Sequence, residues 1–164
     1  MQELNSLFKK HTGKENPTIE ALPSSGSNRR YYRLTAENIS LIGVYGQSRE
    51  ENYAFIELAK HFHSRKLNVP KVLKVSNDLH YYLQEDLGDA VLFDAIDAGR
   101  RTGVFSHEEK ELLHKTIAKL ADFQVEAAKG LNFDVCYPQP EFNERSVYWD
   151  LNYFKYSFLK TTGM

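Results

Sequence analysis

Residues 29–45, Arg-Arg-Tyr-Tyr-Arg-Leu-Thr-Ala-Glu-Asn-Ile-Ser-Leu-Ile-Gly-Val-Tyr, contain two β-patterned runs joined by a short turn. The runs 29–35 and 39–45 are rich in β-branched and aromatic residues, and the segment between them is short enough for a hairpin. A third run, 18–22, precedes them across the turn-rich linker 23–28. We therefore expect three consecutive antiparallel strands.

The sequence after this region predicts one helix and two further strands. Ser48-Arg-Glu-Glu51 has the spacing of a capping box, and Val69-Pro70 should end the helix that it opens. Apolar side chains recur at the helical period at Phe55, Leu58, Ala59 and Phe62. Residues 71–75 and 79–85 then read as a strand pair around a Ser-Asn-Asp turn. The predicted order is β-β-β-α-β-β.

Helices are expected on both sides of this region. The first 16 residues predict a short structural helix with Leu4, Leu7 and Phe8 on one side. Residues 90–98 predict a short helix, and Ser106-His-Glu-Glu109 is a second capping box that opens a long one ending near residue 130. One side of the long helix is marked by Leu113, Ile117, Leu120 and Gln124. A loop at 131–142 and a final helix at 144–160 complete an α+β chain.

Composition excludes several classes of protein. The 21 Lys and Arg residues nearly balance the 22 Asp and Glu residues, which disfavours nucleic acid and membrane surfaces as partners. The longest uncharged apolar stretch, residues 39–46, is far shorter than the roughly 18 residues of a membrane span. Cys136 is the single cysteine, so neither an internal disulfide nor a cysteine zinc pair can form. We expect a cytoplasmic protein.

A polar loop followed by arginines is the first candidate site. Ser24, Ser25, Gly26, Ser27 and Asn28 form the loop between two predicted strands, where backbone amides can approach an anion. The chain contains neither the dinucleotide GxGxxG motif nor the Walker motif. Three arginines follow the loop, and they either face solvent or supply a charge for bound phosphates: Arg29, Arg30 and Arg33. On a strand, the first and last of them share one face.

The second candidate site is the junction Gln84-Glu-Asp-Leu-Gly-Asp89, where a predicted strand meets the helical half. Backbone donors and acceptors exposed there can pair with a flat heterocycle. The carboxylates of Glu85, Asp86 and Asp89 are interpreted as ordinary loop charges. No metal site is predicted at His61 and His63, because residues two apart on a helix do not face together.

Three motifs in this order resemble the aminoglycoside phosphotransferase and choline kinase family: residues 22–34, Asn68-Val-Pro-Lys-Val-Leu73, and Tyr82-Leu-Gln-Glu-Asp-Leu-Gly-Asp89. Residues 146–155 are similar to the family's next helix. Within the family, the likeness is greatest to bacterial kinases that phosphorylate the anomeric hydroxyl of N-acetylmuramate or N-acetylglucosamine. The resemblance implies a protein-kinase-like N-terminal lobe of five antiparallel strands and one helix at 1–86. A hinge and an incomplete helical lobe would follow at 87–164.

The resemblance also implies roles for individual residues. The loop from Ser24 to Asn28 would cover the phosphates of ATP, and backbone groups of Glu85 and Leu87 would hold adenine. A glutamate of the helix after residue 48, either Glu51 or Glu57, would orient the groups that bind the phosphates. The substrate would be a small molecule with a hydroxyl group, such as an amino sugar.

Two departures from the family pattern modify these expectations. The strand at 39–45 has no lysine to pair with the phosphates, so Arg30 or Arg33 is expected to replace it. No His-x-Asp motif occurs, and the catalytic base and the magnesium ligands are expected outside this chain. We therefore expect a nucleotide-binding half that is inactive by itself. The alternative is a non-catalytic, kinase-like binding or assembly module.

The last predicted helix is apolar around much of its circumference. One face carries Val147, Leu151, Phe154 and Phe158, and another carries Trp149, Tyr153 and Tyr156. A helix of this kind is usually buried on several sides. We expect the chain to self-associate through residues 145–160, or this helix to pack in a displaced position against its own lobe.

Overall fold

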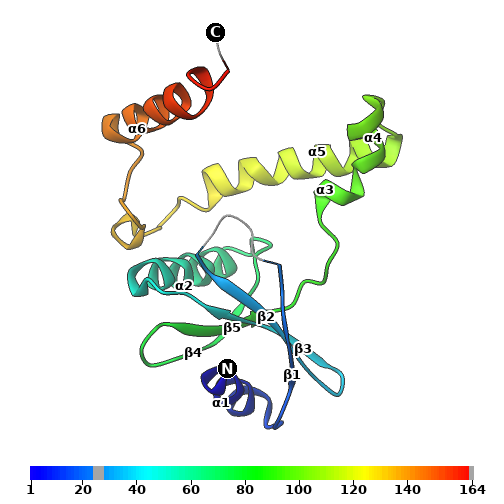
Figure 1. Cartoon of the computed structure of the whole chain (residues 1–164), viewed down its shortest axis with the longest axis vertical. Coiled ribbons are helices and arrows are strands. Elements are labelled where there is room, and N and C mark those ends of the chain that lie inside the picture. Colours follow the sequence, from blue (N-terminus) through cyan, green and yellow to red (C-terminus); the bar gives the residue numbers. More distant parts are fainter. Residues whose placement is uncertain (24–27, 163–164) are drawn as a thin grey trace. The chain divides into compact units, whose positions relative to one another are not determined.

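Five antiparallel strands form one sheet in the computed structural model, which describes residues 1–23 and 28–162 (Figure 1). The order across the sheet is β1-β2-β3-β5-β4. The strands are β1 (Thr18–Ala21), β2 (Arg30–Ala36), β3 (Ile39–Tyr45), β4 (Val72–Val75) and β5 (Tyr81–Glu85). The predicted α+β class and the five-stranded antiparallel sheet are confirmed.

Helices precede, interrupt and follow the sheet. They are α1 (Gln2–Thr12), α2 (Arg49–Ser64), α3 (Leu92–Ala95), α4 (Asp97–Thr102), α5 (His107–Ala121) and α6 (Glu144–Phe154). A π-helical segment, η1 (Asp122–Glu126), extends α5, and another, η3 (Lys155–Leu159), extends α6. Two short helices occupy the region predicted as one at 90–98, and a 3-10 turn, η2 (Phe133–Val135), lies in the predicted loop.

Helix α1 covers one face of the sheet. Leu4, Leu7 and Phe8 are buried against strand residues of β2, β3 and β5, as predicted from their spacing. Gly43 of β3 permits the close approach, because a Cβ atom there would lie 3.0 Å from Leu4 Cδ2 of α1. The apolar side of α1 is therefore structural.

Helix α2 packs on the opposite core cluster, formed by Ile42, Val44, Ile56 and Tyr82. The predicted apolar stripe of this helix is partly wrong, because its buried residues are Asn52, Ala54, Ile56 and Ala59. Buried Asn52 donates hydrogen bonds to the carbonyl oxygens of Gly46 and Leu79, each at 2.9 Å, so a polar residue lies on the buried side of the helix. Phe62 instead meets Phe123 of η1 edge-on, with ring centroids 5.5 Å apart.

Only one of the two predicted capping boxes is complete. In α5, the Ser106 hydroxyl accepts from the Glu109 amide, and the Glu109 carboxylate accepts from the Ser106 amide. In α2, the Ser48 hydroxyl accepts from the Glu51 amide at 3.1 Å, but the Glu51 carboxylate pairs with Arg29 instead. Glu51 therefore forms an ion pair with Arg29 and does not complete the capping box of α2.

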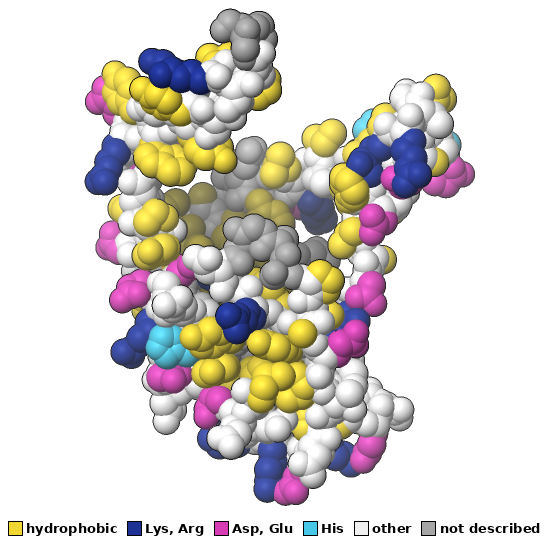
Figure 2. Space-filling model, in the orientation of Figure 1, with side chains coloured by type: hydrophobic (Ala, Val, Ile, Leu, Met, Phe, Trp, Pro, Cys, Tyr) yellow, Lys and Arg dark blue, Asp and Glu magenta, His cyan; other side chains and the backbone are white. Residues whose placement is uncertain are grey.

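The chain divides into two compact units, residues 1–131 and 132–164. The predicted boundary between residues 86 and 87 lies inside the first unit and stays a prediction. In the second unit, yellow apolar side chains gather over α6 in Figure 2. Within residues 1–23 and 28–162, no helix has both the length and the apolar character needed to cross a membrane.

Candidate functional site

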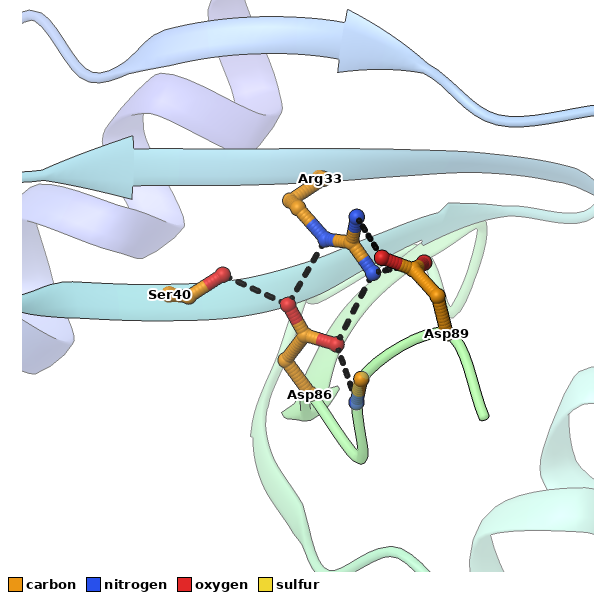
Figure 3. Close-up of polar contacts among 5 residues, drawn as sticks. Arg33, Ser40, Asp86 and Asp89 are labelled. Atoms are coloured by element: carbon orange, nitrogen blue, oxygen red, sulfur yellow. Dashed lines mark hydrogen bonds and ion pairs between the residues drawn. The ribbon is translucent and has the colours of Figure 1, made fainter. Parts of the chain in front are cut away.

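Arg33 of β2 joins the sheet to the segment that follows β5 (Figure 3). Its Nε atom donates to Asp86 Oδ2 at 2.8 Å and its Nη2 atom donates to Asp89 Oδ1 at 2.7 Å. Ser40 of β3 donates its hydroxyl to Asp86 Oδ2 at 2.5 Å, and the Gly88 amide donates to Asp86 Oδ1 at 2.9 Å. We call these five residues the hinge cluster.

Hydrogen bonds from Arg33 lower the pKa of Asp86 to about 2, with burial opposing and Ser40 and Gly88 assisting. The same carboxylates raise the pKa of Arg33. Only 9% of the Asp86 side chain is exposed, whereas 81% of the Asp89 side chain is exposed. The interpretation of Asp86 and Asp89 as ordinary loop charges is therefore wrong, because strand pairing places Arg33 beside them.

At the end of β5, Glu85 is hydrogen-bonded to the chain before β4, whereas Leu87 is exposed. The Glu85 amide donates to the Lys71 carbonyl oxygen at 3.1 Å, and the Glu85 carboxylate accepts from the Lys71 amide at 2.9 Å. Leu87 is 69% exposed, and its backbone forms no hydrogen bond with any residue that the structure describes. The Leu87 amide and carbonyl groups can therefore meet a ligand.

A second cluster lies where β2 begins. The Arg29 Nη2 atom is 3.1 Å from Glu51 Oε1 and donates to the Glu51 carbonyl oxygen at 3.1 Å. The Arg29 guanidinium also lies over the Phe55 ring, 4.9 Å from its centroid, and Phe55 stacks on Tyr82 at 5.3 Å. These four residues, the Arg29 cluster, tie the start of β2 to α2.

The remaining predicted site residues are placed differently. Ser24, Ser25, Gly26 and Ser27 lie outside the described residues, and Asn28 immediately follows them. Arg30 is exposed at the first position of β2. Glu57 forms a surface ion pair with Lys60 at 2.7 Å, so of the two candidate glutamates only Glu51 meets an arginine of β2 or its approach.

Sequence reasoning missed two buried polar groups on β5. The Tyr82 hydroxyl and the Gln84 Oε1 atom have no hydrogen-bond partner among the described residues. Burial raises the pKa of Tyr82. Because alternate residues of a strand share one face, both side chains lie on the face that carries Asp86. This alternation could have indicated from the sequence that residues 82, 84 and 86 lie together. In the described part of the chain, no cluster of three His, Cys, Asp or Glu side chains is arranged for a metal ion.

The second unit holds a pocket of about 520 Å³, lined by Pro138, Gln139, Phe142, Arg145, Ser146, Trp149 and Asp150. It contains an aromatic wall and one charge of each sign. Two stacked ring pairs continue along the helix, Trp149 with Tyr153 and Phe154 with Phe158.

No protein-family model matches this chain, and no curated protein matches it either. The likeness to phosphotransferases therefore stays a prediction carried by the motifs. The described geometry offers an exposed backbone segment held by the hinge cluster, and an arginine held against α2. The first suits a flat hydrogen-bonding ligand, and the second suits an anion.

Proposed function

We propose that this chain is the nucleotide-binding half of an ATP-dependent phosphotransferase that acts on a hydroxyl group of a small molecule. Its first five strands and α2 would form a protein-kinase-like lobe. The three ordered motifs support this, and so does the sheet, because α2 lies between β3 and β4 in the chain and β5 leads into the proposed hinge. An amino sugar is the proposed substrate on the strength of the motifs alone.

The observation that carries the proposal is the geometry of the hinge cluster. Arg33 and Ser40 hold Asp86 against the sheet, and the exposed residue Leu87 follows, with no backbone hydrogen bond to any residue that the structure describes. Adenine presents an amine donor beside a ring-nitrogen acceptor on one edge. The carbonyl oxygen of Glu85 and the amide of Leu87 would supply the complementary acceptor and donor, so recognition would use the main chain.

The chemistry would be completed by groups that this chain does not supply. Phosphoryl transfer needs an aspartate to accept the hydroxyl proton, magnesium ions to neutralise charge, and in-line attack. The sequence contains no His-x-Asp motif to provide that base. Residues of the present chain would bind and orient ATP, and ligands of magnesium would come from outside it.

Titration calorimetry with adenosine and guanosine tests the proposal. We expect weak adenosine binding and guanosine binding at least about tenfold weaker, because guanine reverses the donor and acceptor pattern of the edge that faces the hinge. Asp86→Asn should reduce adenosine affinity several-fold by loosening the hinge, while the exposed β1 control Glu20→Gln should not. Equal affinities for the two nucleosides, or no binding of either, would contradict the proposal.

A second candidate function is a non-catalytic, kinase-like module for binding or assembly. The exposed apolar side chains of α6 and η3 favour it, since 67% of Trp149 is accessible and its neighbours are similarly open. Association through residues 145–160 without adenosine binding would support this function instead of the first.

A further inference from the structure

Within the nucleotide site, and resting on the proposed function above, we infer that Arg29 binds the ATP phosphates and that Glu51 holds it in place. From the resemblance to the kinase family, Arg30 or Arg33 is expected to replace the lysine that the strand at 39–45 lacks. The contacts of the three arginines distinguish them.

Arg33 is committed to the hinge cluster. Three of its nitrogens donate to the two carboxylates, with Nη1 to Asp89 Oδ2 at 3.2 Å and Nη2 to Asp86 Oδ1 at 3.3 Å in addition to the contacts above. One guanidinium beside two carboxylates leaves the cluster with a formal charge of -1. This negative charge would repel a triphosphate. If Arg33 bound the phosphates instead, it would lose its contacts with Asp86 and Asp89.

Arg30 lies on the wrong face of the sheet. Its neighbour Tyr31 packs in the cluster beneath α2, whereas Tyr32 packs in the cluster beneath α1. Because side chains alternate along a strand, Arg30 shares the α1 face and Arg29 shares the α2 face. The α2 face also carries Asp86, which precedes the proposed adenine-binding backbone. Only a cation on that face can serve the same nucleotide.

Arg29 has a suitable position on the sheet, a positive charge and a side chain that is already held in place. It lies at the approach to β2, on the face of the sheet that α2 covers. Its side chain is 13% exposed and is held by Glu51 and Phe55, so little freedom is lost when it meets a ligand. A guanidinium has five donors in a planar fork that matches phosphate oxygens. The ion pair of Arg29 with the Glu51 carboxylate is formally neutral, whereas the hinge cluster carries a formal charge of -1.

This arrangement would replace the lysine that β3 lacks. In protein kinases, a strand lysine paired with a helix glutamate contacts the phosphates. Here the helix glutamate is Glu51, and the cation reaches it from the start of β2. Arg29 is thus the proposed phosphate-binding residue and Glu51 its positioning residue.

The test compares three probes, ATP, inorganic tripolyphosphate and adenosine, on the full chain by calorimetry and by 31P line broadening. In Arg29→Gln we expect ATP and tripolyphosphate affinities to fall about tenfold, the cost of one charge-assisted contact. Adenosine affinity should change less than about twofold. Arg30→Gln, the adjacent exposed control, should leave all three unchanged, and Arg29→Lys should recover part of the ATP affinity because it retains the charge.

Failure of the proposed function and failure of this inference give different results. If the wild type binds neither adenosine nor ATP, the proposed function falls and this inference with it. If the wild type binds ATP and Arg29→Gln binds it equally well, the inference alone is overturned. Equal loss of adenosine and ATP also overturns it, since Arg29 would then support the fold. Should Arg29→Gln not fold, Glu51→Gln, which removes the charged partner that positions Arg29, decides: unchanged ATP and tripolyphosphate affinities there overturn the inference.

Discussion

The carboxylate of Asp86 accepts two hydrogen bonds from the guanidinium of Arg33, at 2.8 and 3.3 Å, although the two residues are 53 positions apart. The contact joins the middle of β2 to the first residue after β5. Because Ser40 of β3 bonds the same carboxylate, three parts of the sheet determine the direction in which the chain leaves it. The start of the segment that follows β5 is therefore fixed to the sheet.

We predict that this contact makes stability depend on acidity. The pKa of Asp86 is about 2 in the folded protein, below its ordinary value near 4. Between about pH 4 and pH 2 the unfolded chain binds more protons, so stability is lost as pH falls through that window. Asp86→Asn should lower the free energy of unfolding by about 1 kcal/mol at pH 7, after allowance for solvent screening. The difference should shrink through that window and vanish below pH 2.

Urea unfolding of the wild type and Asp86→Asn at several pH values measures this effect. Glu20→Gln serves as the control, because it alters an exposed carboxylate on β1. A constant difference between wild type and Asp86→Asn from pH 7 to pH 2 would show that packing, not ionisation, makes the contribution.

Asn52 provides a stability prediction for the first unit. Its buried side-chain amide donates to carbonyl oxygens before α2 and before β5, which leaves Gly46 no room for a side chain. Asn52→Ala should destabilise the protein by about 2 kcal/mol, since buried acceptors lose a donor. The control Lys60→Ala removes a surface ion pair and should cost well under 1 kcal/mol. Thermal unfolding of both variants measures these effects. Equal melting temperatures of Asn52→Ala and Lys60→Ala would contradict a stabilising role for the buried hydrogen bonds of Asn52.

The strands and α2 could be predicted from the sequence because the patterns that indicate them are local. Short turns force neighbouring strands to pair antiparallel, as between β2 and β3. The position of β5 next to β3 could not be predicted, because either strand of the β4–β5 hairpin could pair with β3. The structure selects β5, whose residues Tyr82, Leu83 and Gln84 are buried on both faces, whereas β4 is less buried and suits an edge.

The site was only partly predictable for the same reason. Arg33 meets Asp86 through strand register: Arg33 pairs with Ile42, and Ile42 pairs with Gln84. That register is a tertiary result which no local pattern encodes. The choice between Arg29 and Arg30 likewise depends on which face α2 covers. By contrast, the strand ends beside the candidate residues are local features: a strand was predicted to begin near Arg29 and another to end at Glu85, and β2 begins at Arg30 and β5 ends at Glu85.

Turnover provides a third prediction. The pure chain of 164 residues should transfer no phosphoryl group from ATP to N-acetylglucosamine or N-acetylmuramate, because it has no His-x-Asp motif to provide the base. Coupled ADP assays and 31P spectra of the sugar products measure this directly. Sugar phosphate formed in proportion to enzyme, and sensitive to Asp86→Asn but not to Glu20→Gln, would mean that the catalytic groups lie within this chain.

The last prediction concerns the apolar surface of α6 and η3. Trp149, Tyr153, Phe154 and Phe158 are each about half exposed or more. Fully burying such a side chain contributes roughly 1.5 to 3 kcal/mol, so contact between several of them favours association. We expect sedimentation velocity to show a concentration-dependent dimer or larger species for the wild type.

The double variant Phe154→Glu/Phe158→Glu should sediment as a monomer over the same concentration range, because it places charges on that surface and breaks one stacked pair. Asn152→Glu is the matched control, since it adds charge to the same helix at a polar position and should still associate. Trp149 emission should shift to shorter wavelength as the wild type associates and stay constant in the double variant. A wild type that is monomeric at every concentration, with Trp149 emission already typical of a buried indole, would mean that the helix packs against its own chain in solution.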